Sequence, residues 1–329
     1  NGSLIFFLES NGLLPDSQFG FRPGRSTTGQ LLSFLDQVSS DVHAFGHSDV
    51  ILTDFRCAFD SPTAEKVIIS LASMGIMNPL RDWLFAFISS RKCQVRINEC
   101  LSRPFEMTSG LCQGSPISAT AYIIYVASLA FELEEIGVKC FLYADDLKIC
   151  SPYPALLTRA LVSIESWCAS WQTALAIHKC ICVRFGEGKI PDYLLSGIPI
   201  SKLTDESYRD LGVLIDPQLS FHHHVRHIVS KARSVAAVIL RSFTSRNPHT
   251  LFRAFCVYVR PVLEYASPVW NSISAANSVL IERVQRYFTY RAFLRMDTKK
   301  FSYQRRLIIL GSKTLLHRRK LADLCFVHN

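Results

Sequence analysis

Residues 141–150 read Phe-Leu-Tyr-Ala-Asp-Asp-Leu-Lys-Ile-Cys, a pair of adjacent carboxylates between two short apolar runs. Aromatic and branched side chains recur in each run at period-two spacing, which is typical of β-strands. The pattern predicts a β-hairpin with Asp145 and Asp146 at its tip. Because adjacent like charges repel each other, a cation would favour the ionised form of both. Oxygen ligands without Cys or His suit Mg²⁺, although Asp is also common in ordinary turns.

Another aspartate follows an apolar stretch earlier in the chain. Residues 50–53 read Val-Ile-Leu-Thr, which predicts a buried strand that leads directly into Asp54. A carboxylate in that position is costly unless it has a partner, and a helix cap or a hydrogen-bonded loop aspartate remains an alternative. Asp60 precedes Ser61-Pro62, a typical helix start, so a capping role explains Asp60. Asp54 has no such local explanation and is the better candidate for a functional carboxylate.

A loop rich in hydrogen-bond donors occupies residues 18–28, which read Gln-Phe-Gly-Phe-Arg-Pro-Gly-Arg-Ser-Thr-Thr. A helix is predicted after it, with Thr27 or Thr28 as the expected cap. A helix N-terminus combined with Arg22 and Arg25 suits a phosphate group. The alternative is a surface turn with solvated arginines.

A second loop, residues 110–116, reads Gly-Leu-Cys-Gln-Gly-Ser-Pro and leads into a long apolar helix predicted over residues 117–136. Gly114 would let a ligand approach the backbone closely, and Gln113 offers an amide donor and acceptor. Ser115 and Pro116 are expected at the N-cap and in the first turn. A ligand role for Gln113 stays open on these residues alone.

Length and composition indicate a folded intracellular protein. The 329 residues suffice for two or three subdomains, and 49% of them are hydrophobic, which excludes a disordered tail. The 11 cysteines lack CxxC spacing, which argues against a disulfide framework and favours the cytoplasm and/or the nucleus. No signal peptide is visible, and the apolar run at 119–131 is too short to span a membrane, so no membrane partner is expected. Because the first residue is Asn1, a fragment is expected.

Charge divides the chain into an acidic front and a basic back. Residues 221–329 hold 19 Lys and Arg against 4 Asp and Glu, whereas residues 1–220 hold 17 against 23. This division indicates metal chemistry in one part and a grip on a polyanion in the other. The basic residues could instead only solvate helix faces, but such faces usually mix both signs. The order of predicted elements indicates an α+β unit followed by a helical unit.

Five sequence blocks, taken in order, resemble the reverse transcriptases of non-LTR (LINE-type, jockey-like) retrotransposons. They are QFGFRPGRST at 18–27, TDFRCAFD at 53–60, GLCQGSP at 110–116, YADD at 143–146 and LGV at 211–213. YASPVW at 265–270 and the later Val284-Gln285-Arg286 resemble the family's region after the palm. The resemblance implies an α+β right-hand polymerase fold. It assigns residues 1–220 to N-terminally truncated fingers and a palm, and residues 221–329 to a helical, basic, thumb-like region.

The resemblance also implies a catalytic centre. Asp54, Asp145 and Asp146 match the family's catalytic carboxylates, which hold two Mg²⁺ ions, with Mn²⁺ as an alternative. Lys179 resembles the lysine proposed to assist the departure of pyrophosphate, although the link that precedes it is shorter than is usual in the family.

Contacts to the incoming nucleotide and to the primer follow from the same resemblance. Phe59 matches the gate residue beneath the sugar of the incoming nucleotide. Leu211 and Gly212 resemble the primer grip. The remaining residues that the resemblance places at the dNTP are Arg22, Arg25, Gln113 and Gly114.

The function implied is RNA-directed DNA polymerisation, in which a dNTP is added to a primer 3′-hydroxyl. The expected partners are an RNA template, a DNA primer and dNTPs. One alternative is a truncated, inactive, element-derived remnant that only binds nucleic acid, which the absence of the family's first fingers blocks would favour. Another is a two-metal nuclease, which would not explain Phe59, Gln113 or the arginine loop. Endonuclease and zinc-knuckle segments are expected to lie outside this sequence.

Overall fold

The computed structural model of the chain describes residues 2–89, 91–204, 206–296 and 301–328. The chain divides into two units, Asn1–Thr204 and Asp205–Asn329, which are described separately. The sequence had suggested a division between residues 220 and 221. The structure divides the chain earlier because the strand at 213–215, which pairs with the strand at 208–210, packs against the first helix of unit 2.

A five-stranded sheet in the order β13-β10-β1-β8-β7 forms the centre of unit 1. β1 is its middle strand, and the side chains of Val50 and Ile51 are fully buried because helices cover both faces. The predicted buried strand before Asp54 is therefore confirmed. All neighbouring strands are antiparallel except β10 and β13. The bounds are β1 His47–Thr53, β7 Lys139–Tyr143, β8 Asp146–Ser151, β10 Ile181–Gly186 and β13 Ser201–Leu203.

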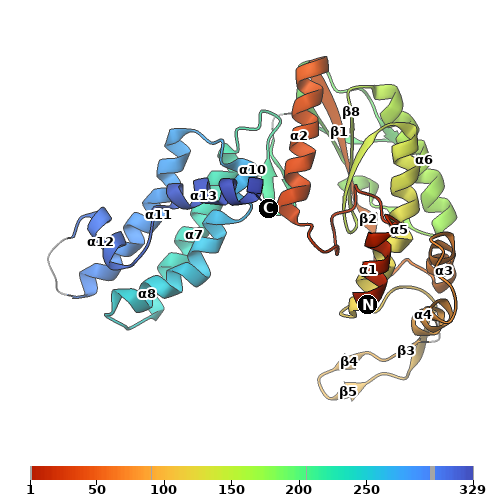
Figure 1. The fold of residues 1–329 in the computed structure, drawn as a ribbon, viewed down its shortest axis with the longest axis horizontal. Coiled ribbons are helices and arrows are strands. Elements are labelled where there is room, and N and C mark those ends of the chain that lie inside the picture. The colour runs from red at the N-terminus through yellow and green to blue at the C-terminus, as the bar shows by residue number, and fades with distance from the viewer. Residues whose placement is uncertain (1, 90, 205, 297–300, 329) are drawn as a thin grey trace. The chain divides into compact units, whose positions relative to one another are not determined.

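Three helices cover this sheet, α2 on one face and α5 and α6 on the other (Figure 1). Their bounds are α2 Thr27–Phe45, α5 Pro116–Ile136 and α6 Pro154–Trp171. The hydroxyl of Ser26 accepts a hydrogen bond from the N–H of Gly29 (3.0 Å) and caps α2. The expected cap at Thr27 or Thr28 was therefore wrong by one or two positions, because the helix begins at Thr27 itself.

α5 is the central helix of the unit's core. The five successive residues 122–126 are each at most 2% exposed, so the helix is covered on all sides. In length and composition α5 could cross a membrane, the one such helix in the part of the chain that the structure describes, yet 72% of its most apolar window is buried. A helix that is apolar all round is typical of a core as well as of a membrane span. The helix is longer than the apolar run at 119–131 that the sequence analysis considered.

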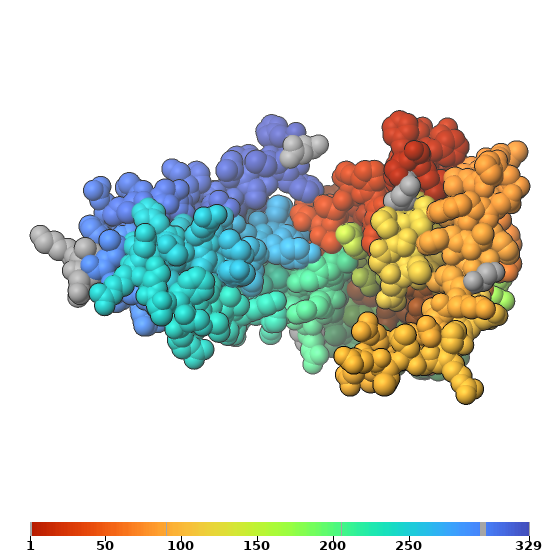
Figure 2. Space-filling view, turned by 90° about the horizontal axis from the view of Figure 1, so that it is seen from below, coloured from red at the N-terminus to blue at the C-terminus, as the bar shows by residue number. Residues whose placement is uncertain are grey.

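Smaller elements complete unit 1. Two nested ladders, β3 with β6 and β4 with β5, form a hairpin that projects from the unit, visible in Figure 1 and as a golden lobe in Figure 2. α3 packs on both α4 and α5. The bounds are α1 Gly2–Ser10, β2 Phe55–Arg56, α3 Ala64–Ser73, α4 Leu80–Ile88, β3 Arg91–Cys93, β4 Arg96–Ile97, β5 Cys100–Leu101, β6 Phe105–Met107, β9 Ala174–Leu175, the 3₁₀ helix η1 Ile177–Lys179, β11 Leu194–Leu195 and β12 Ile198–Pro199.

A buried ion pair joins the middle strand to its neighbour. The carboxylate of Asp49 in β1 accepts hydrogen bonds from Nε (2.6 Å) and Nη2 (2.7 Å) of Arg184 in β10, and from the hydroxyl of Tyr193 (2.6 Å). Asp49 is fully buried and the side chain of Arg184 is 10% exposed. Burial and the hydrogen bond to Asp49 raise the pKa of Tyr193. The buried charge is thus balanced and its lone pairs are used, which such a pair requires.

Unit 2 contains a short hairpin and a set of packed helices. Residues 208–215 form two paired strands, because Leu211 (φ 42°) and Gly212 (φ 88°) reverse the chain. α7 packs against α11, and the rings of Phe255 and Phe288 meet in the core with centroids 4.9 Å apart. The bounds are β14 Tyr208–Asp210, β15 Val213–Ile215, α7 His222–Ser242, α8 Pro248–Ala254, the π-helix η2 Phe255–Val259, α9 Arg260–Glu264, α10 Ser267–Trp270, α11 Ala275–Phe293, the 3₁₀ helix η3 Leu294–Met296, α12 Tyr303–Ile309 and α13 Leu315–His328.

Replacing Asp49 tests the buried ion pair. We predict that Asp49→Ala lowers the free energy of unfolding by about 3–5 kcal/mol, because the Arg184 guanidinium stays buried without its counter-charge. Asp192→Ala is the control: Asp192 pairs with Lys202 at 2.6 Å but its side chain is 83% exposed, and the loss should stay below about 1 kcal/mol. Urea denaturation measures both values. Equal losses would show that the buried pair contributes no more than the surface pair.

Candidate active site

The tip of the β7–β8 hairpin carries the paired aspartates, as predicted. Tyr143 pairs with Asp146, which leaves Ala144 and Asp145 as the turn. Ala144 has a φ of 58° and is only 6% exposed. A left-handed backbone costs a residue with a Cβ roughly 1–2 kcal/mol. The turn that presents Asp145 is therefore strained and needs support from elsewhere in the fold.

The side chain of Gln18 gives that support. Its Oε1 accepts hydrogen bonds from the backbone N–H groups of Ala144 (3.0 Å) and Gly20 (2.8 Å), and its Nε2 donates to the carbonyl oxygen of Ala144 (3.3 Å). Gln18 is fully buried. Its carboxamide thus satisfies both backbone groups of Ala144, as a neighbouring strand would. Because an unsatisfied buried group costs about 1–3 kcal/mol, these bonds offset the strain of the turn.

The chain beside Gln18 fits closely against the hairpin. Leu142 donates a backbone hydrogen bond to residue 17 and accepts one from residue 19, each at 2.8 Å. A Cβ on Gly20 would lie 2.3 Å from the backbone nitrogen of Ala144, so this position requires glycine. No role for Gln18 or Gly20 follows from the sequence alone. A glutamine in a loop has no local signal of a buried contact, and a glycine in a loop is equally expected in an ordinary turn.

Asp54 lies at the same end of the sheet as this turn. β1 and β8 are antiparallel with Thr53 opposite Leu147, so the end of one strand meets the beginning of the other. Burial raises the pKa of Asp145, and the negative charge of Asp54 raises it further. The two carboxylates are therefore close enough to repel each other, which favours a cation between them.

Lys179 provides one positive charge beside Asp54. Its Nζ lies 2.7 Å from Oδ2 of Asp54, and this contact raises the pKa of the lysine. The 3₁₀ helix η1 holds it there, since the N–H of Ala176 just before η1 donates to the carbonyl oxygen of Asp54 (2.8 Å). The structure thus brings Lys179 to the aspartates, while its predicted role in pyrophosphate departure stays a prediction.

Phe59 is half-buried in an aromatic cluster next to the carboxylates. Its ring stacks on that of Tyr122 (centroids 4.7 Å apart, planes at 18°) and meets the edge of Phe21 (6.2 Å). The pKa of Tyr122 is raised, mainly by burial and then by the charge of Asp145. Tyr122 therefore links Phe59 to the aspartates, a contact that sequence reasoning did not identify.

The loop with Gln113 and Gly114 lies beside Phe59. The N–H of Leu111 donates to the carbonyl oxygen of Phe59 (2.7 Å). Gln113 and Gly114 are exposed, and a Cβ on Gly114 would meet no atom of the described residues within 4 Å, so a ligand can approach here. Ser115 is the N-cap of α5 as predicted, although its hydroxyl makes no capping bond to the backbone that the structure describes.

The two arginines of the first loop are engaged within unit 1. Nε and Nη2 of Arg22 donate to the two carboxylate oxygens of Glu9 (2.8 and 2.6 Å), and Nη1 donates to two backbone carbonyls. The side chain of Arg22 is only 4% exposed. Arg25 pairs with Asp16 (2.6 Å). These contacts correct the expectation that Arg22 is presented to a triphosphate, because nearly all of its donors already stabilise the loop.

Leu211 and Gly212 form the turn of the β14–β15 hairpin in unit 2. The hydroxyl of Tyr265 donates to the carbonyl oxygen of Leu211 (2.8 Å), and a Cβ on Gly212 would lie 3.1 Å from the Tyr265 ring. The turn is thus held by the segment that the sequence analysis singled out at 265–270. Its role as a primer grip stays a prediction.

The donor set at the hairpin tip suits a hard divalent cation. Asp54 directly follows β1 and Asp145 directly precedes β8, so both offer carboxylate oxygens at the same end of two adjacent strands. Within the residues that the structure describes, no three His, Cys, Asp or Glu side chains come together as a metal site, and the expected role of Asp146 as a metal ligand stays a prediction. Mg²⁺ typically uses only one or two carboxylates and takes its other ligands from water and substrate phosphates. Two carboxylates therefore fit such an ion.

The chain is similar to known proteins in both sequence and fold. A family model described as "Reverse transcriptase (RNA-dependent DNA polymerase)" matches residues 4–215. The probable RNA-directed DNA polymerase from transposon X-element of Drosophila melanogaster is 22% identical over 297 residues, 86% of this chain and 32% of that protein. The RNA-directed DNA polymerase from mobile element jockey of Drosophila funebris is 24% identical over 274 residues, which cover 78% of this chain and 30% of that protein. The chain spans about a third of the length of these relatives.

Solved structures share the fold. Telomerase from Candida tropicalis aligns with a TM-score of 0.52 at 11% identity, both in its apo form and in complex with a TWJ fragment of telomeric RNA. These alignments cover 93% (apo) and 94% (complex) of this chain and 52% of each telomerase. The mixed helix and sheet of a reverse transcriptase polymerase fold, predicted from the sequence blocks, is confirmed.

Removing the Gln18 carboxamide tests its support of the turn. We predict that Gln18→Leu lowers the free energy of unfolding by about 1–3 kcal/mol and speeds hydrogen exchange at the Ala144 amide, which loses its acceptor. Gln30→Leu is the control, because Gln30 is equally buried but bonds Lys148 (2.8 Å) instead of the turn. Amide exchange relative to global unfolding measures the effect. Equal protection of Ala144 in both variants would contradict the assignment.

Proposed function

This chain belongs to the reverse transcriptase (RNA-dependent DNA polymerase) family, and we propose that it contains the polymerase centre of a jockey-like non-LTR retrotransposon. In this proposal it transfers a nucleotidyl group from a dNTP to the 3′-hydroxyl of a DNA primer on an RNA template. The observation that carries the proposal is that Asp54 and Asp145 lie at the same end of two adjacent strands, where the charge of Asp54 acts on Asp145.

The carboxylates are the proposed metal ligands. Reverse transcriptases generally use divalent metal ions; here Asp54 and Asp145 would hold them, with Asp146 next in the chain. When bound, Mg²⁺ or Mn²⁺ would acidify the primer hydroxyl and neutralise charge on the leaving pyrophosphate. Lys179 holds a proton at Nζ, and its side chain is 61% exposed, so it can donate to a departing phosphate. Phosphoryl transfer needs such positioning and charge more than covalent help.

The residues around the carboxylates are the proposed nucleotide contacts. Phe59, stacked on Tyr122, gives a flat apolar surface for the sugar. Gln113 and Gly114 give an exposed amide and an open stretch of backbone beside it. Arg25 stays at the surface of the first loop.

The proposed partners and location follow from the family and from the thiols. The telomerase that shares this fold was solved with a fragment of telomeric RNA, which supports RNA as a partner of this chain as well. All 11 cysteines are free thiols, which supports a location in the cytoplasm and/or the nucleus.

Primer extension on an RNA template tests the catalytic assignment. We predict that Asp54→Asn and Asp145→Asn each lower extension more than about 100-fold, because a neutral amide is a poor ligand for Mg²⁺. Asp60→Asn is the control, an exposed carboxylate six residues after Asp54. Circular dichroism checks that all variants fold. Extension by Asp145→Asn at the rate of the unchanged protein would refute the assignment, and template binding without extension by the unchanged protein would refute the polymerase proposal.

The choice of sugar tests Phe59. We predict that Phe59→Val raises the ratio of kcat/KM for ribonucleotides to that for deoxynucleotides, because the smaller side chain leaves room for a 2′-hydroxyl that the ring excludes. Phe21→Val is the control, since Phe21 touches the same ring only by its edge. The cavity should also cost stability, on the order of 1–3 kcal/mol. If the ratio does not move while Phe59→Val still folds and polymerises, the ring only packs.

A further inference from the structure

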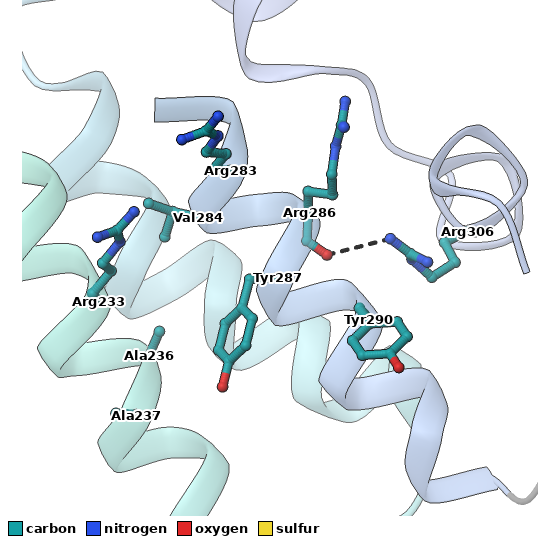
Figure 3. A pocket seen from close by; sticks show the side chains of 9 residues that line it. All are labelled: Arg233, Ala236, Ala237, Arg283, Val284, Arg286, Tyr287, Tyr290 and Arg306. Atoms are coloured by element: carbon teal, nitrogen blue, oxygen red, sulfur yellow. Dashed lines mark hydrogen bonds between the residues drawn. The ribbon is translucent and has the colours of Figure 1, made fainter. Parts of the chain in front are cut away.

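A groove in unit 2 has a composition that the catalytic centre does not explain. It lies between α7 and α11, has a volume of about 770 Å³, and is named here the α7–α11 groove. The residues that define it are Arg233 and Ala236 of α7 and Arg283, Val284, Tyr287 and Tyr290 of α11. In Figure 3, Tyr287 extends from α11 toward α7, and Arg233 and Arg283 lie on either side of Val284. The groove thus has an apolar floor, aromatic walls and a cationic rim.

The aromatic walls expose ring surface that a folded helix pair would otherwise bury. Tyr287 is 53% exposed and Tyr290 is 38% exposed. The hydroxyl of Tyr287 accepts a hydrogen bond from Nη1 of Arg291 (2.7 Å), which fixes the ring. The guanidinium of Arg306 lies 5.7 Å from the centre of the Tyr290 ring. Held rings with free area are suitable platforms for stacking by a planar group.

The charge of the groove is entirely positive. Four of its nine lining residues are arginines and none is acidic. Within α7, α11 and α12 the one acidic residue is Glu282. Glu282 is already used, because it accepts hydrogen bonds from the hydroxyl of Tyr303 and from the N–H of Leu316. An anion that enters the groove would therefore meet arginines without a competing carboxylate.

A buried arginine adds to this positive field. Arg306 is 6% exposed and donates to Thr289 Oγ1 (3.2 Å) and to the carbonyl oxygens of Phe301 (2.8 Å) and Arg286 (3.3 Å). All three acceptors are neutral, and no carboxylate among the described residues forms an ion pair with it. Burial accordingly lowers its pKa. A guanidinium without a counter-charge strengthens the attraction for an anion, because a buried charge is costly when unpaired.

We infer that the α7–α11 groove binds a single-stranded segment of polynucleotide, with a base stacked on Tyr287 and the phosphates against Arg233 and Arg283. The inference rests on the proposed function, because it supplies that polymerase with a place for unpaired strand. Only unpaired bases offer their faces to protein rings, since duplex bases stack on one another. A peptide is a poorer fit, because its backbone N–H groups need acceptors, and among the side chains that line the groove only the two tyrosine oxygens can accept a hydrogen bond.

Fluorescence anisotropy with labelled 20-nucleotide oligomers of uridine and of deoxythymidine tests the inference on the whole chain. Tyr287→Leu, an exposed position where the change leaves the core intact, should weaken binding about tenfold through lost stacking. Arg283→Gln should weaken it and reduce the slope of log K against log salt by about 0.7 per lost phosphate contact. The matched controls are Tyr258→Leu and Arg253→Gln, at exposed positions outside the groove. Both should bind as the unchanged protein does.

An abasic oligomer separates stacking from charge. The unchanged protein should bind the abasic oligomer about tenfold more weakly than the normal oligomer. Tyr287→Leu should bind the two oligomers equally, because that variant has already lost the stacking contact. Tighter binding of the uridine or of the deoxythymidine oligomer shows which of these two strands the groove prefers, and either supports the inference.

Three results would overturn the inference. One is equal weakening by groove and control variants, which indicates a diffuse basic surface. Another is tighter, groove-dependent binding of poly-glutamate than of either oligomer. The third is that the unchanged protein and Tyr287→Leu lose the same factor in affinity when the abasic oligomer replaces the normal one. Primer extension is measured in parallel: extension with groove-independent binding overturns this inference alone, whereas groove-dependent binding without extension overturns the polymerase proposal alone.

Discussion

The hydrogen bonds between the Gln18 carboxamide and Ala144 are the constraint on which the catalytic end of unit 1 depends. They hold a left-handed alanine that would otherwise be unfavourable, and that residue sets the direction of Asp145. Gly20 is required beside it because any side chain there would strike the Ala144 nitrogen. The first loop therefore acts as a support for the hairpin tip, and Arg22 in turn fastens that loop to Glu9.

The sheet adds a second constraint, the closeness of like charges. Antiparallel pairing of β1 and β8 brings Asp54 to the turn, and burial together with the charge of Asp54 raises the pKa of Asp145. A fold tolerates such crowding when a cation is part of its working state. Lys179 already supplies one positive charge to Asp54. In unit 2 the crowded charges are positive: arginines without carboxylates line an aromatic groove, and this arrangement favours a bound anion.

Local patterns in the sequence were enough to predict the hairpin at 141–150, the buried strand before Asp54 and the helix that begins at Pro116. They could not reveal Gln18, because its partner Ala144 lies 126 residues away and only the fold joins them. Arg22 was assigned to a triphosphate from the resemblance and from its place before a helix, because nothing in the sequence of the loop indicated its contact with Glu9, 13 residues earlier. The turn at Leu211 could not be predicted either, because a residue other than glycine adopts a positive φ there, which composition does not signal.

The central claim is that Asp54 and Asp145 form one cation site in a chain whose turn is held in advance by Gln18. Anomalous X-ray diffraction from crystals grown with Mn²⁺ and a nonhydrolysable dNTP tests it most directly, because the ion scatters where it binds. The account predicts an anomalous peak within coordination distance of carboxylate oxygens of both Asp54 and Asp145. A Mn²⁺ peak bound to neither aspartate, with the nucleotide ordered elsewhere on the chain, would contradict it.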